Sequence, residues 1–226
     1  MDMGSVNNKI CKMKTIAVFG GTSGLGVKLV PLLEEKYRVI SLGSKDVDVT
    51  YFGEVKKFFE GGEVDIVLNL AGISYDVYLS RITEDDYKPI IDMLDVNIMG
   101  LVNILAGCLP HMVKKKWGRV ITISSVLSEM NVPKASLYSA SKAFVDRLIS
   151  SANKENIKYG VTCNSIQLGY WDGGMCERLD PVFREKVKDN IGLKRWGTVE
   201  ELHNTINYLV DNEYVCGVNL KLDGGL

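Results

Sequence analysis

Short apolar runs alternate with longer amphipathic stretches along the chain. Seven of these runs have the length and composition of buried strands. They are residues 15–20, 38–42, 46–50, 64–72, 119–125, 161–167 and 217–225. Most stretches between them have helical spacing, as in residues 25–37, where Leu29, Leu32 and Leu33 share one face. This alternation predicts an α/β, doubly wound fold, a seven-stranded parallel sheet with helices on both faces.

Two of the expected helices begin with a capping box, in which a Thr and an acidic residue three positions later bond to each other's backbone N–H groups. The pairs are Thr83 with Asp86 and Thr198 with Glu201. The most apolar segment, residues 96–109, is expected to form a helix that ends near Pro110. That segment contains two asparagines and is too short to span a bilayer.

The overall composition is that of one soluble domain. With 226 residues and 46% hydrophobic content, we expect one domain over residues 1–226, with residues 1–13 as a flexible extension. The formal net charge of −1 gives no general attraction to nucleic acid or anionic membranes. The polar start lacks an apolar signal segment, and the five cysteines are scattered without a C-x-x-C pair. We therefore expect a cytoplasmic protein with no disulfide framework, metal site, nucleic-acid partner or membrane anchor.

A glycine-rich loop, GGTSGLG, joins the first expected strand to the first helix. Gly20, Gly24 and Gly26 permit a tight turn and let a diphosphate approach the backbone. The helix that follows offers free N–H groups and a positive dipole end to the anion. The spacing G-x-x-x-G-x-G differs from the G-x-G-x-x-G dinucleotide fingerprint. A structural turn is the alternative, but the position at the first strand–helix junction favours a nucleotide site.

The segment YSASK places Tyr138 and Lys142 one helical turn apart, with small residues between them. A free phenol has a pKa of about 10 and is a poor proton donor or acceptor at neutral pH. A neighbouring ammonium group favours the phenolate and lowers that pKa. The pair is therefore a candidate acid–base site, and an ordinary surface helix is the alternative.

Five motifs follow one another in a fixed order along the chain. They are the glycine loop, N-x-A-G at residues 69–72, a helical asparagine at Asn97, a serine ending the strand 119–125, and Tyr-x-x-x-Lys. Together, over about residues 15–225, they resemble the short-chain dehydrogenase/reductase family. The resemblance implies a Rossmann fold and an NAD(P)(H)-dependent oxidoreductase, which reduces a carbonyl to an alcohol by hydride transfer.

The resemblance also implies roles for individual residues. The family's catalytic serine lies thirteen positions before the tyrosine, which selects Ser125 over Ser124. Ser125 is expected to hydrogen bond to the substrate carbonyl oxygen, and Tyr138 to act as general acid/base. Lys142 is expected to tune Tyr138 and to hold the nicotinamide ribose. Asn97 resembles the residue whose backbone carbonyl holds a water next to that lysine, and a helix-packing amide is the alternative.

The residues expected to contact the cofactor come from the glycine loop, the strands that follow it, the YSASK helix and the loop after the sixth strand. They are Gly20, Thr22, Ser23, Gly24, Leu25, Gly26, Ser44, Lys45, Asp48, Val49, Asn69, Ala71, Gly72, Tyr138, Lys142, Gly169 and Trp171. Two neighbouring positions depart from the usual family pattern, with Phe19 in place of Thr and Leu70 in place of a second Asn. Because that Thr side chain normally bonds toward the later strand, we expect the two departures to be coupled.

The end of the second strand bears on the choice between NADP(H) and NAD(H). An NAD enzyme usually places an acidic side chain there, which accepts a hydrogen bond from the ribose 2′-OH. Here the sequence is SLGSK, so Ser44 can donate and Lys45 can supply charge for a 2′-phosphate. Asp46 comes next, and a shift of one position would bring it to the ribose. We expect NADP(H) to be favoured over NAD(H).

The loop after the sixth strand reads LGYWDGGM. Leu168 replaces the usual Pro and Gly173 replaces a Thr, so one expected side-chain contact to the cofactor is missing, although the backbone N–H of Trp171 can still bond to its carboxamide. The expected substrate-binding residues are Ser125, Tyr138, Tyr170, Trp171 and Met175. Met130 and Val132 complete an apolar, aromatic mouth, for which packing within the loops is the alternative. The substrate is expected to be a small carbonyl or alcohol of unspecified identity.

Two other functions share parts of this pattern. An NDP-sugar epimerase or dehydratase also carries Tyr-x-x-x-Lys, but such chains are typically longer and have G-x-x-G-x-x-G spacing. A regulatory protein of the same fold would bind a nucleotide without catalysis. Loss of the Ser, Tyr or Lys would favour that alternative, and all three are present.

Self-association is expected from two helices that are apolar on more than one face. These are the helix through Asn97 and Asn103 and the helix after Tyr138, with Leu101, Ile104, Phe144 and Leu148. Family members commonly pair these helices across a twofold axis. We therefore expect a homodimer or homotetramer with closed symmetry.

Overall fold

The computed structural model describes residues 13–171 and 180–226. The expected N-terminal extension, residues 1–13, lies outside the described residues except for Met13. Met175 and Gly173, which the sequence places near the substrate and cofactor, also lie outside them.

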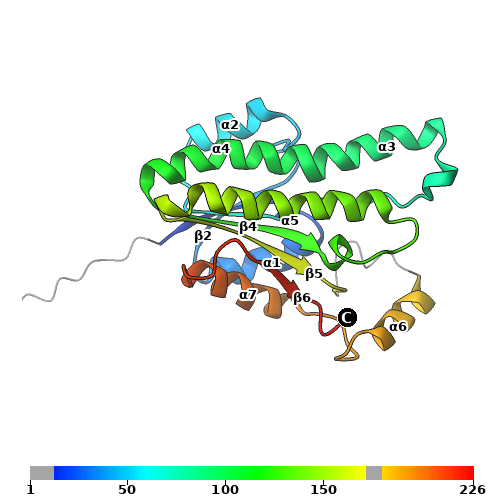
Figure 1. The fold of residues 1–226 in the computed structure, drawn as a ribbon. Coiled ribbons are helices and arrows are strands. Elements are labelled where there is room, and N and C mark those ends of the chain that lie inside the picture. Colours follow the sequence, from blue (N-terminus) through cyan, green and yellow to red (C-terminus); the bar gives the residue numbers. More distant parts are fainter. Residues whose placement is uncertain (1–12, 172–179) are drawn as a thin grey trace, which may run out of the picture.

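A parallel sheet of six strands runs through the described part of the chain in the order β2-β1-β3-β4-β5-β6 (Figure 1). The strands are β1 (Thr15–Phe19), β2 (Arg38–Leu42), β3 (Ile66–Asn69), β4 (Gly118–Ser125), β5 (Val161–Leu168) and β6 (Asn219–Leu222). In the register, Phe19 pairs with Leu42 on one side and with Asn69 on the other. The strand order therefore changes direction at β1 and β3, and doubly wound folds bind ligands at the carboxyl ends of the strands at such a point.

The expected strand at residues 46–50 is wrong, which leaves six strands in place of seven. This segment forms two local turns. The Asp46 carboxylate accepts from the Gly43 backbone N–H at 2.8 Å, and the Gly43 carbonyl accepts from the Asp46 N–H at 3.0 Å. Asp48 Oδ1 in turn accepts from the Thr50 N–H at 2.9 Å. Aspartates favour such turns because their short side chains bond to nearby backbone groups, which then do not pair with a strand.

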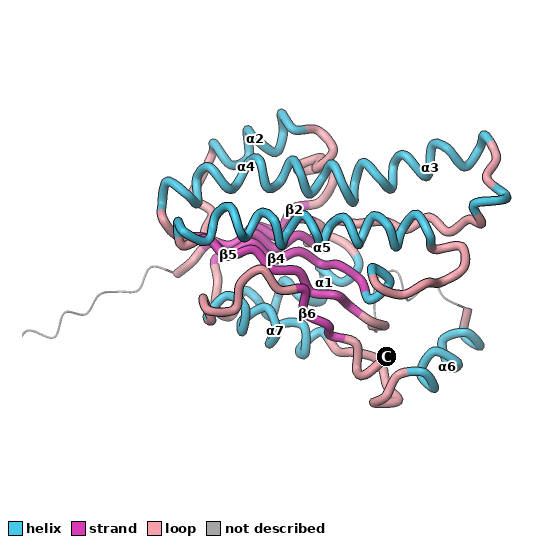
Figure 2. The backbone as a smooth tube through the Cα atoms, in the orientation of Figure 1, coloured by secondary structure: helices cyan, strands magenta, loops and turns pink. Residues whose placement is uncertain are grey.

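Helices cover both faces of the sheet (Figure 2). The α-helices are α1 (Gly24–Glu34), α2 (Phe52–Glu60), α3 (Glu84–Leu94), α4 (Gly100–Lys115), α5 (Ser136–Asn156), α6 (Pro181–Asn190) and α7 (Val199–Asp211). A π-helical turn, η2 (Asp95–Met99), joins α3 to α4, and short 3-10 turns lie at η1 (Leu79–Arg81), η3 (Val126–Ser128) and η4 (Ile157–Tyr159). Helices α2, α4 and α5 lie on one face, and α1 and α7 on the other. Both predicted capping boxes are confirmed, at the starts of α3 and α7.

Two apolar cores separate the sheet from its helices, and β1 contributes to both. Ala17 and Phe19 belong to the core under α2, α4 and α5. Ile16 and Val18 belong to the core over α1 and α7. All five residues of β1 are buried, as expected for a central strand covered on both faces.

The helix through Asn97 and Asn103 is longer than expected. It passes Pro110 and ends at Lys115, since Met112 beyond the proline is buried in the core at 1% exposure. Burial of the last turns offsets the hydrogen bond that the proline removes. Together α3, η2 and α4 form one helical stretch of 32 residues with a mean hydropathy of 1.6, long and apolar enough to cross a membrane. Half of its apolar window is buried within the structure, which is typical of a core helix.

Candidate active site

The YSASK segment lies in the first turns of α5, with Tyr138 and Lys142 facing the sheet. Tyr138 is 8% exposed and Lys142 is 4% exposed. Lys142 Nζ lies 5.7 Å from the centre of the Tyr138 ring and donates to the Ile123 carbonyl of β4 at 3.0 Å. Burial lowers the pKa of Lys142 to about 8, and the negative charge of Asp146 opposes that fall. The surface-helix alternative is therefore wrong for this pair.

The two serines that end β4 make different contacts. Ser124 Oγ donates to the Lys142 carbonyl at 3.3 Å, which links α5 to the strand. Ser125 Oγ accepts from the Leu127 N–H at 3.2 Å, so its proton is available to an acceptor such as a carbonyl oxygen. Ser125, Tyr138 and Lys142 thus come from one strand end and one helix, and we refer to them as the Ser–Tyr–Lys group.

Asn97 lies in the π-helical turn η2 and is 2% exposed. Its side-chain amide pairs with both backbone groups of Ile73, accepting from the N–H and donating to the carbonyl, each at 2.9 Å. It also donates to Ser141 Oγ at 3.0 Å, and Ser141 Oγ donates to the Tyr138 carbonyl at 2.7 Å. The Asn97 amide therefore ties the segment after β3 to α5, as the packing alternative predicts. The role of the Asn97 backbone carbonyl stays a prediction.

The glycine loop between β1 and α1 is shaped so that only glycine fits at its key positions. Gly20 has φ +79°, and a Cβ on it would lie 2.9 Å from the Ala71 nitrogen. A Cβ on Gly26 would lie 2.3 Å from the Gly20 carbonyl oxygen. Helix α1 starts at Gly24, and the residue before it, Ser23, makes no side-chain capping hydrogen bond. The Gly26 N–H donates to the Ser23 carbonyl at 3.0 Å, and the start of the helix still directs its positive dipole end at the loop, which therefore fits a diphosphate.

The segments after β2 and β3 complete a path from this loop to Lys142. A Cβ on Gly72 would lie 3.2 Å from Lys142 Nζ and 3.4 Å from Asn97 Oδ1, so the backbone there passes next to the lysine. Asn103 Nδ2 donates to the Val49 carbonyl at 2.9 Å and fixes that segment on α4. The residues present therefore fit an extended dinucleotide. Asn103 was missed from the sequence as a support for this path, because nothing local links it to Val49.

The side chains of Ser44, Lys45 and Asp46 after the end of β2 are all exposed, and they differ in their hydrogen bonds. Ser44 and Lys45 are exposed. The Asp46 carboxylate is engaged by the Gly43 N–H in the turn described above. Asp48 Oδ1 accepts from both the N–H and the hydroxyl of Thr50, the latter at 2.8 Å.

The two departures from the family pattern point into different cores. Phe19 packs edge-on against Phe58 with ring centres 5.7 Å apart, in the core under α2 and α4. Leu70 packs against the core over α1 and α7. The strands remain joined there by the backbone, with the Leu70 N–H donating to the Phe19 carbonyl at 2.8 Å. The two side chains therefore lie in different cores, and the coupling of the two departures stays a prediction.

The residues after β5 are held against a later segment, residues 192–198, which we call the support segment. The Trp171 ring is buried at 4% exposure, and a Cβ on Gly197 would lie 2.8 Å from it. The Tyr170 ring meets the Trp196 ring edge-on at 5.7 Å, and the Tyr170 carbonyl accepts from the Gly197 N–H at 3.1 Å. The rings of Tyr170 and Trp171 are thus packed by the support segment. This favours the loop-packing alternative for their side chains.

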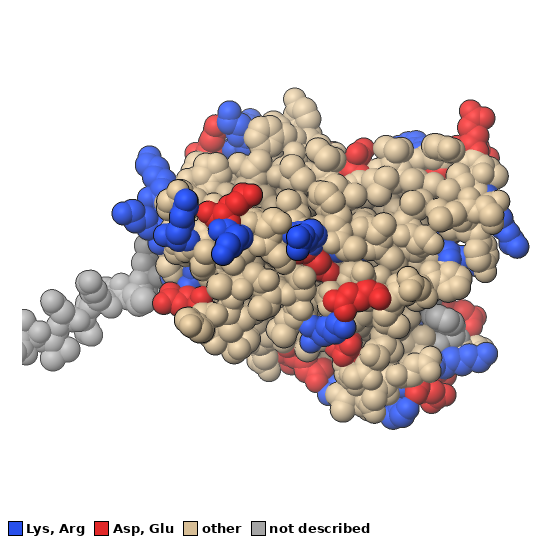
Figure 3. Space-filling view, in the orientation of Figure 1, with Lys and Arg blue, Asp and Glu red and all other residues tan. Residues whose placement is uncertain are grey.

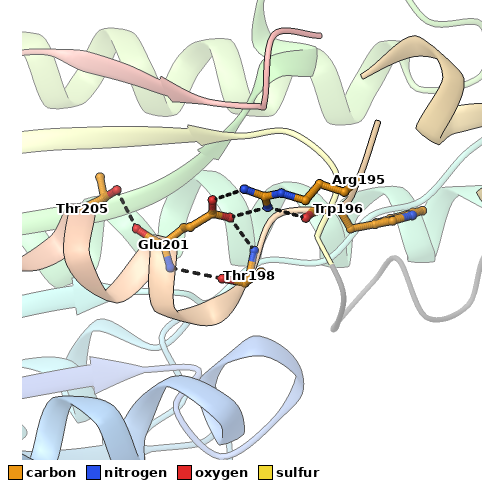
Figure 4. Close-up of polar contacts among 5 residues, drawn as sticks. All are labelled: Arg195, Trp196, Thr198, Glu201 and Thr205. Atoms are coloured by element: carbon orange, nitrogen blue, oxygen red, sulfur yellow. Dashed lines mark hydrogen bonds and ion pairs between the residues drawn. The ribbon is translucent and has the colours of Figure 1, made fainter. Parts of the chain in front are cut away.

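An ion pair fixes the support segment to the start of α7 (Figure 4). Arg195 bonds to both carboxylate oxygens of Glu201, at 3.0 and 2.6 Å, and to the Trp196 carbonyl at 3.0 Å. The same carboxylate accepts from the Thr198 N–H at 2.9 Å. The Arg195 hydrogen bond, followed by that of the Thr198 N–H, lowers the pKa of Glu201 to about 2. The sequence predicted the capping box of Thr198 and Glu201. It did not predict the ion pair with Arg195, because that arginine lies outside the helix.

A surface hollow of about 490 Å³ lies beside α5. Its lining consists of the loop 127–133 and the outer residues of α5, Ser136, Ser139, Ala140 and Ala143. Met130 and Val132 belong to it, as the predicted mouth requires. Ser125 and Tyr138 do not line it, so the hollow adjoins the Ser–Tyr–Lys group and does not contain it.

Comparison with known proteins agrees with this geometry. The sequence model described as short chain dehydrogenase matches residues 44–181. A 3-oxoacyl-[acyl-carrier-protein] reductase from Staphylococcus epidermidis is 28% identical over 94% of this chain and 98% of its own. A gluconate 5-dehydrogenase from Burkholderia cenocepacia, solved with NADP and tartrate, is 25% identical with a TM-score of 0.84, over 94% of each chain.

A NAD⁺-bound xylitol dehydrogenase is 21% identical with a TM-score of 0.85, over 94% of this chain and 98% of its own, and shows the same fold. The family match covers more than half of the sequence, and the five motifs lie where such a fold needs them. The chain belongs to the short-chain dehydrogenase/reductase family of NAD(P)-dependent oxidoreductases, which reduce carbonyls to alcohols.

Proposed function

We propose that the protein is an NADP(H)-dependent carbonyl reductase in which Tyr138 is the general acid/base. The observation that carries this proposal is the buried ammonium group of Lys142, 5.7 Å from the Tyr138 ring and one turn along the same helix. A Tyr–Lys pair on an exposed helix surface would not require Lys142 to be buried, and it would not require the strand end with Ser125 next to it. The arrangement has the parts that protonation of a carbonyl oxygen requires.

Each member of the Ser–Tyr–Lys group has one task at the reacting centre. When bound, NADPH supplies the hydride. Ser125 donates a hydrogen bond to the substrate carbonyl oxygen and stabilises the negative charge that develops there. Tyr138 delivers a proton to that oxygen, and the Lys142 ammonium lowers the cost of the phenolate that remains. The Asn97 amide holds the helix in place, and its backbone carbonyl is assigned the water next to Lys142.

The proposed cofactor path follows the contacts described above. The glycine loop and the start of α1 hold the diphosphate. The adenosine side lies against the segments carrying Asp48, Val49, Asn69 and Ala71, and Lys142 holds the nicotinamide ribose. Gly169 and the backbone N–H of Trp171 face the nicotinamide carboxamide, a contact that does not need the Trp171 side chain.

NADPH is the proposed cofactor because the end of β2 offers positive charge and hydroxyl donors. Ser44 and Lys45 are exposed there, while one oxygen of the Asp46 carboxylate accepts a hydrogen bond from the Gly43 N–H. Replacing Lys45→Ala should weaken NADPH binding about tenfold or more and leave NADH binding nearly unchanged. Lys154→Ala, an exposed lysine at the far end of α5, is the matched control. Equal losses for both cofactors would contradict the assignment.

The proposed substrate is a small carbonyl compound that approaches Ser125 and Tyr138 from the mouth formed with Met130 and Val132. The side chains of Tyr170 and Trp171 pack against the support segment and hold the residues after β5 in place. Met175, also assigned to the substrate, lies outside the described residues. Since a relative is named a 3-oxoacyl-[acyl-carrier-protein] reductase, 3-oxoacyl thioesters are the first compounds to test.

The proposed assembly is a cytoplasmic homodimer or homotetramer that pairs α4 and α5 with their copies. Figure 3 shows an almost uncharged surface over the start of α5 and the neighbouring part of the long helix. Met99 and Phe144 lie on these elements and are 45% and 40% exposed. Sedimentation at micromolar concentration should give a dimer or tetramer, and Phe144→Glu should shift it toward monomer. A monomeric unmodified protein would contradict this assembly.

The function is tested by following NADPH consumption with a panel of aldehydes, ketones and 3-oxoacyl thioesters. With NADPH deuterated at the transferable position, the product alcohol should carry deuterium on its carbinol carbon. NADPH binding without reduction of any carbonyl in the panel would favour the regulatory alternative.

A further inference from the structure

Helix α5 buries a second charged side chain one turn beyond Lys142. Asp146 is 5% exposed and lies on the same sheet-facing side of the helix, four positions further along. Burying a carboxylate is costly unless it is hydrogen-bonded and its charge is compensated. The mechanism proposed above does not use Asp146, so its burial requires a separate explanation.

Two consecutive inward residues of β5 bond to the Asp146 carboxylate. Ser165 Oγ donates to Oδ1 at 2.7 Å, and Gln167 Nε2 donates to Oδ2 at 2.8 Å. Gln167 Nε2 also lies 3.1 Å from Glu129 Oε1, and two carboxylate acceptors fix the direction of that amide group. These bonds hold Asp146 in one position against the strand and satisfy its oxygens as an anion. They supply no positive charge.

Other charged groups near Asp146 are exposed or already paired. Lys142 is therefore the buried cation next to Asp146. Glu129, beyond η3, is paired with Lys221 of β6 at 2.7 Å. The side chain of Arg147 lines a surface hollow of about 220 Å³ together with Asp146, and is exposed. The side chains that β4, β5 and η2 direct at this part of α5 are Ser124, Ser165, Gln167 and Asn97, and none of them ionises. Tyr138 is the remaining titratable group in this part of the helix, since Lys154 and Glu155 lie further along α5.

Lys142 in turn needs an anion. In the described residues its Nζ has one carbonyl acceptor, that of Ile123, although an ammonium has three protons to donate. Burial lowers the pKa of Lys142, and with the opposing effect of the Asp146 charge included the pKa lies at about 8. Without that charge the lysine would lose its proton closer to neutral pH. A neutral Lys142 could not stabilise a Tyr138 phenolate.

We propose that Asp146 is a positioning residue that serves as the buried counter-charge of Lys142 and keeps it an ammonium at neutral pH. Ser165 and Gln167 hold the carboxylate at the helix turn where it acts on Lys142. The consequence for catalysis rests on the proposed function, whereas the effect of Asp146 on the charge of Lys142 is independent of it.

The test replaces Asp146→Asn, which keeps the size and polar contacts of the side chain and removes its charge. The titration of Lys142 is followed by NMR of protein labelled with ¹³C and ¹⁵N in lysine, and Lys142→Met identifies the signal. The midpoint of Lys142 should fall from near 8 by about one pH unit, because residues four positions apart on a helix are neighbours and a neighbouring opposite charge commonly shifts a pKa by one unit or more. Glu129→Gln is the matched control, since it removes the other carboxylate bonded to Gln167, and it should leave the midpoint near that of the unmodified protein.

A merely structural role for Asp146 would change thermal stability without moving the titration, and an unchanged midpoint in a folded Asp146→Asn protein would overturn the proposal. If that variant does not fold, Asp146→Ser carries the same measurement with a smaller neutral side chain. In an active enzyme, the alkaline limb of the pH–rate profile should move to lower pH by the same amount. A shifted midpoint in a protein that reduces no carbonyl would support the counter-charge and refute the proposed function.

Discussion

The two sides of the proposed site are built in different ways. The Ser–Tyr–Lys group lies on β4 and α5, where regular backbone fixes each position and buried contacts such as Ser124 to the Lys142 carbonyl hold the helix to the strand. Residues 169–171, which follow β5, belong to no helix, and the support segment holds them through ring packing and the Arg195–Glu201 ion pair. In that pair the side chains are 49% and 38% exposed.

This difference predicts how strongly each side resists change. Contacts inside regular elements are buried, so the loss of one costs more than the loss of an exposed contact. An exposed ion pair contributes about 0–1 kcal/mol and weakens with salt. We therefore expect the largest effects at the catalytic helix and the smallest at the ion pair that holds the support segment.

The largest effect is expected for Lys142→Ala. This change removes the ammonium that stabilises the Tyr138 phenolate and the group assigned to the nicotinamide ribose. Turnover should fall by about 10²–10⁴ or more, and NADPH affinity should fall as well. Steady-state kinetics and isothermal titration measure the two losses, with Lys154→Ala as control. Loss of turnover without any loss of affinity would separate the two tasks assigned to Lys142.

An intermediate effect is expected for Gly197→Ala, which acts on the support segment. The added methyl group would lie 2.8 Å from the Trp171 ring, so the ring or the segment must shift. Overpacking of this kind costs about 1–3 kcal/mol of the free energy of unfolding. The KM for NADPH should rise because the Trp171 backbone moves, while the chemistry at Tyr138 is retained.

Gly62→Ala is the matched control for that change, because a Cβ there meets nothing within 4 Å. Chemical denaturation and steady-state kinetics on both variants measure the effect. If the Gly197→Ala and Gly62→Ala proteins have the same stability and the same KM for NADPH, the contact between Gly197 and the Trp171 ring does not hold Trp171 in place.

The smallest effect is expected for Glu201→Gln, which breaks the ion pair and keeps a side chain that can cap α7. At pH 7 the Tm should fall by about 1–3 °C. The pKa of Glu201 lies at about 2 in the folded protein, below its ordinary value, so its contribution is complete above about pH 4.5 and is lost as pH falls toward 2. Scanning calorimetry should therefore give a smaller difference between the two proteins at pH 3 than at pH 7. A difference that grows on acidification would contradict this role.

The sequence predicted the parts of the molecule that depend on local pattern. The spacing of Tyr138 and Lys142 predicted one helix face, and the thirteen-residue distance of Tyr138 from Ser125, which the family resemblance implies, selected a strand end; the structure has the three residues there. The capping boxes were predictable for the same reason, since each is a contact over three positions.

The parts that were wrong or missed depend on contacts between distant segments. The run 46–50 has the apolar alternation of a strand, but the carboxylates of Asp46 and Asp48 close turns in it. The ring of Trp171 was expected at the substrate, and Gly197, 26 positions away, gives it a packing surface. The π-helical turn that holds Asn97 has no sequence signal of its own in this chain.

The central claim is that Tyr138 delivers the proton to the substrate oxygen, and Tyr138→Phe tests it most directly. The change removes one hydroxyl group and keeps the ring, so NADPH affinity should stay within about twofold while turnover falls by about 10²–10⁴. Single-turnover kinetics on the best substrate of the carbonyl panel, with NADPH binding measured on the same preparations, gives both quantities. A Tyr138→Phe protein that keeps near-full turnover on that substrate would contradict the mechanism.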